Sequence, residues 1–124
     1  MSFGQQTKYG LVDGLSSGKT YGSYCGFAGQ HPPSRILLEK MVKRSDIKLL
    51  QNWIEGPNTV LKTYAAEGMI RLSNEGKFQV PEEIRAIILE IKQSKTEIPS
   101  CTGCVYSRIT IEEALADFEF ETTP

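Results

Sequence analysis

One helical pattern constrains the fold of this chain more than any other feature. Between Asn58 and Gly76, apolar and small residues recur at intervals of three and four positions, which places their side chains on one face of an α-helix. The positions of this stripe are Leu61, Tyr64, Ala65, Gly68, Met69 and Leu72. Because a mid-helix glycine costs about 1 kcal/mol relative to alanine, Gly68 indicates close packing. The pattern predicts a long helix packed tightly against its neighbours.

Three shorter helices are predicted around this one. The first covers residues 35–44, follows two prolines and takes Ser34 as its N-cap. The second begins at a Ser45 or Asp46 cap, and the fourth opens at Pro81. Turns of only a few residues separate the four helices, which favours antiparallel neighbours. The chain is therefore predicted to be mainly α, with two antiparallel helical hairpins.

The segment Asn58 to Leu72 also carries a family resemblance. There a capped start leads into the small-residue stretch Tyr64-Ala65-Ala66, and residues 34–94 as a whole resemble the HEAT and armadillo class of α-helical repeats. A plain four-helix stack fits the same pattern, since a repeat array needs at least three copies at a fixed period. The resemblance implies a surface that binds a protein or peptide, and it implies no catalytic residue.

The two ends of the chain differ from this helical block. Residues 1–32 hold seven of the eleven glycines, which disfavours helix. Five aromatic residues are interleaved with these glycines: Phe3, Tyr9, Tyr21, Tyr24 and Phe27. They predict an arm packed on the body by its rings. Residues 33–124 are predicted to form a single helical domain with a Cys-x2-Cys loop at 96–104, a short strand at 105–109 and a short C-terminal helix.

Charge and hydropathy exclude several classes of function. The net charge is −1, so no nucleic-acid partner is predicted. No apolar run is long enough for a membrane span. Residues 1–20 lack the basic start and hydrophobic run of a signal peptide, which favours the cytoplasm. A basic cluster of Arg35, Lys40, Lys43, Arg44 and Lys48 is read as a solvated face. The acidic stretch 96–124 is likewise interpreted as a solvated segment. The alternatives are that it folds over the basic helices or contacts a basic partner.

The three cysteines and the single histidine carry the most specific chemical hypothesis. Cys101 and Cys104 have the Cys-x2-Cys spacing of a zinc half-site, and Cys25 with His31 would complete a Cys3His set if the arm folds back. A disulfide from Cys25 to Cys101 or Cys104 is an alternative, and free thiols are a third. No cofactor is expected, and zinc is the one that this pattern allows.

The function that follows best is a non-enzymatic protein-binding or adaptor module. The sequence shows amphipathic helices but no set of nucleophile, base and orienting carboxylate. The main alternative is a small zinc or thiol protein that uses the cysteines and His31. A hydrolase or transferase with Cys25 as nucleophile and His31 as base ranks last. The partner is expected to be a protein or peptide, and the oligomeric state stays open.

Overall fold

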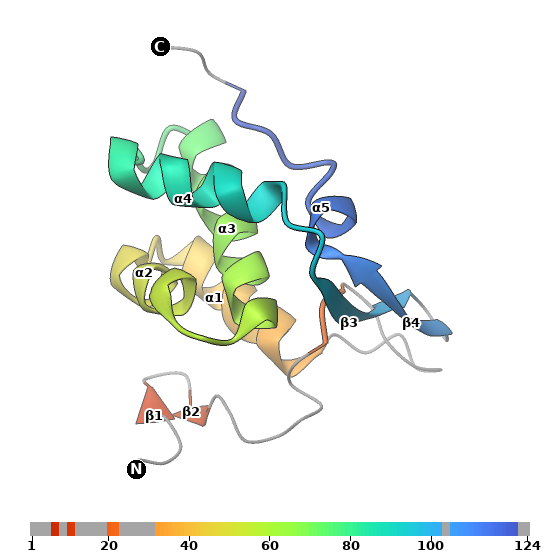
Figure 1. Cartoon of the computed structure of the whole chain (residues 1–124). Helices are drawn as coiled ribbons and strands as arrows, with labels where there is room; N and C mark the ends of the chain where they lie inside the picture. The colour runs from red at the N-terminus through yellow and green to blue at the C-terminus, as the bar shows by residue number, and fades with distance from the viewer. Residues whose placement is uncertain (1–5, 8–9, 12–19, 23–31, 103–104, 122–124) are drawn as a thin grey trace.

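A computed structural model describes residues 6–7, 10–11, 20–22, 32–102 and 105–121. Over these residues the chain is mainly helical, with two small antiparallel sheets, β1–β2 and β3–β4, of two strands each (Figure 1). The elements are β1 (Gln6–Thr7), β2 (Gly10–Leu11), α1 (Pro33–Lys43), α2 (Ile47–Glu55), α3 (Thr59–Asn74), α4 (Glu82–Lys92), β3 (Glu97–Thr102), β4 (Val105–Thr110) and α5 (Ile111–Ala114). None of the described helices is long and apolar enough to cross a membrane.

The long helix predicted from the stripe is α3, and it lies at the centre of the molecule (Figure 1). The helices α1, α2 and α4 all pack against it. A Cβ atom at Gly68 would lie 3.0 Å from Leu38, 3.1 Å from Leu50 and 3.3 Å from Val42. The close packing predicted at Gly68 is therefore confirmed, because side chains of α1 and α2 occupy the space beside it.

Polar side chains cap the N-termini of most of the described helices. Asp46 caps α2, and the Asn58 side chain accepts a hydrogen bond of 2.9 Å from the backbone N–H of Leu61. Thr110 begins α5 with a full capping box. The predicted Ser34 cap is wrong, because α1 begins at Pro33 and Ser34 is buried inside it. A proline suits the first helical position, since its φ is already helical and no N–H is needed there.

The predicted loop at 96–104 is also wrong over most of its length. Residues 97–102 form strand β3, which pairs with β4 so that buried Ile98 lies opposite Ile109. A proline disrupts a strand only where its missing N–H would be needed for pairing. Pro99 does not stand at such a position. Its carbonyl accepts a hydrogen bond from Tyr21 on the side away from β4, so Pro99 costs the β3–β4 ladder nothing.

Residues Thr20–Gly22, here called the strap, lie along the other edge of β3. Tyr21 and Ser100 form a parallel bridge. The Tyr21 N–H donates to the Pro99 carbonyl at 3.0 Å, and the Cys101 N–H donates to the Tyr21 carbonyl at 3.2 Å. Besides the strap, β1, β2 and Pro32, the predicted arm lies outside the described residues, and its boundary at residue 32 stays a prediction.

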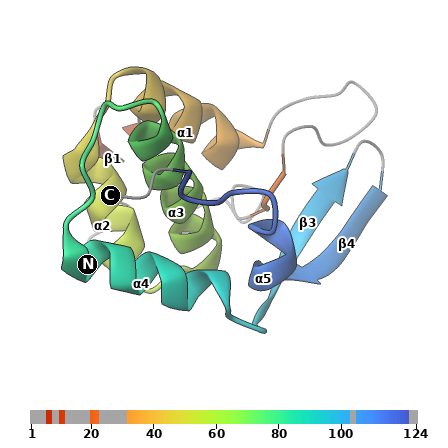
Figure 2. The same cartoon turned by 90° about the horizontal axis from the view of Figure 1, so that it is seen from above.

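The C-terminal segment after α5 runs back across α3, as the dark blue trace in Figure 2 shows. Lys92 on α4 donates to the carbonyl oxygens of Leu115 and Phe118, at 3.0 and 2.6 Å. The Asn74 side chain, at the end of α3, bonds the backbone of Glu119 and Glu121. This segment is therefore held against α3 and α4.

Candidate functional site

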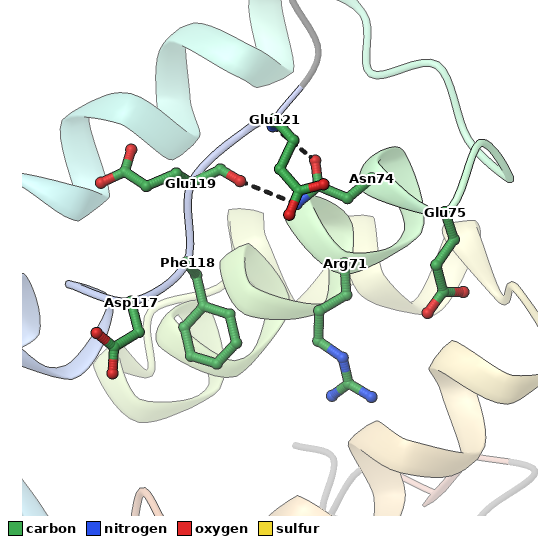
Figure 3. A pocket seen from close by; sticks show the side chains of 7 residues that line it. All are labelled: Arg71, Asn74, Glu75, Asp117, Phe118, Glu119 and Glu121. Carbon is green, nitrogen blue, oxygen red and sulfur yellow. Dashed lines mark hydrogen bonds between the residues drawn. The ribbon is translucent and has the colours of Figure 1, made fainter.

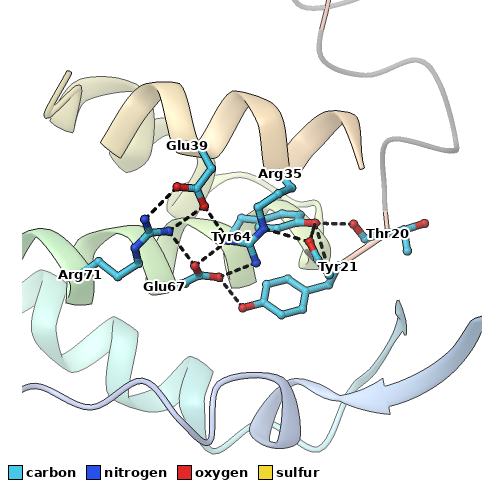
Figure 4. A network of polar contacts seen from close by, with 8 residues as sticks. Thr20, Tyr21, Arg35, Glu39, Tyr64, Glu67 and Arg71 are labelled. Atoms are coloured by element: carbon cyan, nitrogen blue, oxygen red, sulfur yellow. Dashed lines mark hydrogen bonds and ion pairs between the residues drawn. The ribbon is translucent and has the colours of Figure 1, made fainter. Parts of the chain in front are cut away.

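Glu67 on α3 is the centre of a buried network of charged and phenolic side chains (Figure 4). It is 2 % exposed and accepts two hydrogen bonds from Arg35 of α1, at 2.7 and 3.0 Å. Arg71, one turn further along α3, donates at 2.9 Å, and the Tyr21 hydroxyl donates at 2.5 Å. Buried charges are stable only when they are paired and hydrogen-bonded. Glu67 meets this condition, because Arg35 and Arg71 pair with its charge and all of these contacts are hydrogen bonds.

The network extends to the surface through Arg71 and Glu39. Both terminal nitrogens of Arg71 donate to Glu39 on α1, at 2.8 and 2.9 Å. Hydrogen bonds from Arg71 hold the pKa of Glu39 at about 2, below its ordinary value of 4.5. Glu39 and Glu67 together fix the guanidinium of Arg71 in one position, where it also lines a groove on the surface.

The pKa of Glu39 leads to a pH dependence of folding stability. Because its pKa is lower in the folded than in the unfolded protein, Glu39 stabilises the fold above about pH 5 and loses this effect as the pH falls to about 2. We expect urea unfolding of Glu39→Gln to be less sensitive to pH than that of the wild type over this range. Glu97→Gln removes an exposed carboxylate instead and should leave the wild-type profile unchanged; equal profiles for Glu39→Gln and wild type would contradict the assignment.

Two tyrosines connect the network to the strap. The Tyr64 hydroxyl donates to the Thr20 carbonyl at 2.6 Å and accepts from the Gly22 N–H at 3.0 Å. The rings of Tyr21 and Tyr64 lie 4.6 Å apart. Burial raises the pKa of Tyr64 to about 12 and that of Tyr21 further still, so both hydroxyls stay protonated and can donate. The strap is thus held by side chains from α3 as well as by the edge of β3.

Gly22 is required where the strap meets β3. A Cβ atom there would lie 2.5 Å from the carbonyl oxygen of Cys101 and 3.1 Å from its sulfur. The Gly22 carbonyl also accepts a hydrogen bond of 2.9 Å from Arg35. Any larger residue would displace the strap from the strand or break this bond.

A groove of about 420 Å³ lies between the end of α3 and the C-terminal segment (Figure 3). Its lining residues are Arg71, Asn74, Glu75, Asp117, Phe118, Glu119 and Glu121. Asp117 and Glu75 stand on opposite sides, with the Phe118 ring and the Arg71 guanidinium between them. Glu119 pairs with Lys92 at 3.5 Å. Glu75 pairs with Lys77 at 3.4 Å, so Asp117 and Glu121 are the carboxylates that make this groove acidic.

The predicted metal or disulfide set lies mostly outside the described residues. This holds for Cys25, His31 and Cys104, so the zinc hypothesis stays a prediction. Cys101 is buried on β3 and disulfide-bonded. Among the described residues, no group of three or more His, Cys, Asp or Glu side chains is placed to hold a metal ion.

Arg35 does not lie on the solvated basic face predicted for it, since it is only 6 % exposed. The sequence did not predict the role of Glu67. One signal was present: Glu67 interrupts a stretch of apolar and small residues, and Arg71 follows it by one helical turn. A carboxylate on a buried helix face needs a cationic partner. The distant partner, Arg35, is set by the packing of α1 on α3.

Comparisons with known proteins add no family to this description. No protein-family model matches the chain, and neither a curated protein nor a solved structure shows significant similarity to it. The function is therefore inferred from the fold and the site.

Proposed function

We propose that this chain is a non-enzymatic protein-binding module that takes a basic segment of a partner protein in the acidic groove. The observation that carries the proposal is the groove itself, with a volume of about 420 Å³ on a rigid frame. The side chains of Asn74 and Lys92 fix the backbone of its outer wall. The frame needs little reordering on binding, which favours affinity.

The charges in the groove set the class of partner. Arg71 is already matched by Glu39 and Glu67. Asp117 and Glu121 have no ion pair within the described part of the chain, so they are available to lysine or arginine side chains of a partner. The Phe118 ring, which is partly buried, offers an apolar surface for the long stems of those side chains.

The network around Glu67 supports a binding role over a catalytic one. Glu67 accepts hydrogen bonds from Tyr21, Arg35 and Arg71, so its oxygens are occupied by donors of the protein. A general base needs an oxygen within reach of a substrate proton. These hydrogen bonds instead hold α1, α3 and the strap together.

The HEAT-like arrangement of two hairpins is part of this proposal. Support comes from the short turns that join α1 to α2 and α3 to α4, with Ser45 at φ 52° and Gly76 at φ 74°. In helical repeats, binding surfaces lie along stacked helices. Here the proposed surface is the C-terminal end of α3 with the segment that crosses it.

Peptide binding tests this function. We expect a fluorescent lysine-rich peptide to bind in a salt-dependent manner, and a glutamate-rich peptide of equal length not to bind. Asp117→Asn combined with Glu121→Gln should raise the Kd roughly two- to thirtyfold, since exposed ion pairs contribute about 0.2–1 kcal/mol each. The matched control, Glu55→Gln with Glu97→Gln, changes the net charge equally outside the groove. Equal binding by both peptides, or equal weakening by both double variants, would refute the proposal.

A second candidate function is a zinc or thiol protein that uses Cys25, His31, Cys101 and Cys104. The disulfide form of this candidate is favoured by one observation, the disulfide of Cys101, whose sulfur lies beside Gly22 of the strap. Intact mass measured under native conditions and under reducing, denaturing conditions tests it. Bound zinc or a reducible disulfide supports this candidate, whereas a metal-free protein with three titratable thiols excludes it.

A further inference from the structure

The outer edge of β4 is unpaired in the part of the chain that the structure describes. β4 pairs with β3 alone, in a register that puts Tyr106 opposite Cys101 and Arg108 opposite Pro99. Figures 1 and 2 both show β4 at the margin of the molecule, with β3 between it and the helices. Such an edge presents backbone donors and acceptors to any strand that reaches it.

The hydrogen bonds of the strap show which groups of β4 face outward. The Pro99 carbonyl and the Cys101 N–H point toward Tyr21, and thus away from β4. In an antiparallel pair, residues opposite such positions also point their backbone groups away from the partner strand. The N–H and C=O groups of Tyr106 and Arg108 therefore point out of the sheet.

The two edges of this sheet are protected differently. The edge of β3 carries Pro99 and is covered by the strap. β4 has the sequence Val-Tyr-Ser-Arg-Ile-Thr, which is rich in residues that favour strands. It has no proline or lysine, the residues that commonly block edge pairing. Tyr106 is 64 % exposed, the most exposed large apolar side chain of the described residues.

We propose that the outer edge of β4 pairs antiparallel with β4 of a second copy of this chain, about a two-fold axis at Ser107. This register sets Tyr106 opposite Arg108 of the second copy, twice by symmetry. Both residues have outward backbone groups, so the two pairs form four hydrogen bonds. Each arginine then faces a tyrosine ring across the strands, a favourable cation–π pair.

Other two-fold registers of β4 with itself are less favourable. An axis at Arg108 would place the two arginines directly opposite each other, and like charges in this position are destabilising. An axis at Tyr106 would pair Arg108 with a residue before the start of β4. A strand of another protein would need residues complementary to Tyr106 and Arg108, whereas β4 of a second copy always supplies them. The interface is short, so the dimer is weak and depends on concentration.

Covalent trapping of a Ser107→Cys variant tests this dimer. At the two-fold axis the two Cα atoms would lie about 4.5 Å apart, within the range of a disulfide. We expect mild oxidation to give a dimer linked through position 107 of both copies, located by peptide mapping. Glu97→Cys, which places an exposed thiol on β3, and the wild type should give no such dimer. Crosslinks at equal yield in both variants would contradict the proposal.

Tyr106→Pro gives an independent measurement. It removes an outward N–H without removing a bond to β3, and prolines are tolerated at such edge positions. We expect the wild-type mass to rise with concentration in sedimentation experiments, and this rise to be lost in Tyr106→Pro while the circular dichroism is kept. A wild type that stays monomeric at all concentrations, together with a Ser107→Cys variant that gives no link at position 107, would overturn the proposal. Equal association of the wild type and Tyr106→Pro would overturn it as well. None of these residues lines the acidic groove, so failure of one proposal leaves the other standing.

Discussion

Replacement of Glu67 by alanine is expected to lower the free energy of unfolding by about 3–5 kcal/mol. The change removes the buried carboxylate that pairs with Arg35, whose side chain is 8 % exposed. It also leaves the Tyr21 hydroxyl without its acceptor. A buried charge that loses its partner keeps the full cost of having left water. Chemical denaturation followed by circular dichroism measures the effect.

Glu97→Ala is the matched control for this variant. Glu97 pairs with Arg108 at 3.5 Å, and both side chains are about 60 % exposed. Exposed pairs of this kind contribute about 0–1 kcal/mol. Should Glu67→Ala itself fail to fold, Glu67→Gln keeps the side-chain size and removes the charge, and it should still destabilise the fold more than Glu97→Ala. Equal losses for the buried and the exposed carboxylate would show that the network does not stabilise the fold.

Replacement of Gly68 by leucine is expected to destabilise the protein by about 3 kcal/mol or more, at the upper end for an overpacked core. A single Cβ at this position already meets Leu38, Val42 and Leu50 at 3.0–3.3 Å. The further atoms of leucine would have to push α1 and α2 away from α3. Thermal and urea unfolding of the variant would measure the loss.

Ala86→Leu is the control for the change in side-chain size. Ala86 lies on the exposed side of α4, so a leucine there has room and keeps a high helix propensity. Its stability should stay close to that of the wild type. The stability of Gly68→Ala should lie between those of Gly68→Leu and Ala86→Leu, since the tight contacts of its Cβ oppose the roughly 1 kcal/mol gain in helix propensity. A Gly68→Leu protein as stable as Ala86→Leu would contradict the tight packing of the three helices.

Local patterns determined the helices. The apolar stripe of residues 61–72 predicted α3, and the structure confirms the capped helix start at Asn58. A helix and its N-cap depend on interactions between residues within about one turn of each other, and such residues are close together in the sequence. The acidic character of residues 117–121 was also visible in the sequence, although the groove they line was not.

Pairing between distant segments was decided by the tertiary structure. Residues 97–102 became a strand because β4 and the strap supply partners on both edges, and because Pro99 has its missing N–H on the edge away from β4. In the same way, Arg35 left the solvated face predicted for it because α1 packs on α3 beside Glu67. The sequence by itself determined where the helices form and, apart from the start of α1, where they begin, since those interactions are local. Only the folded chain decided which charges are buried and which strands meet, because both depend on contacts between residues far apart in the sequence.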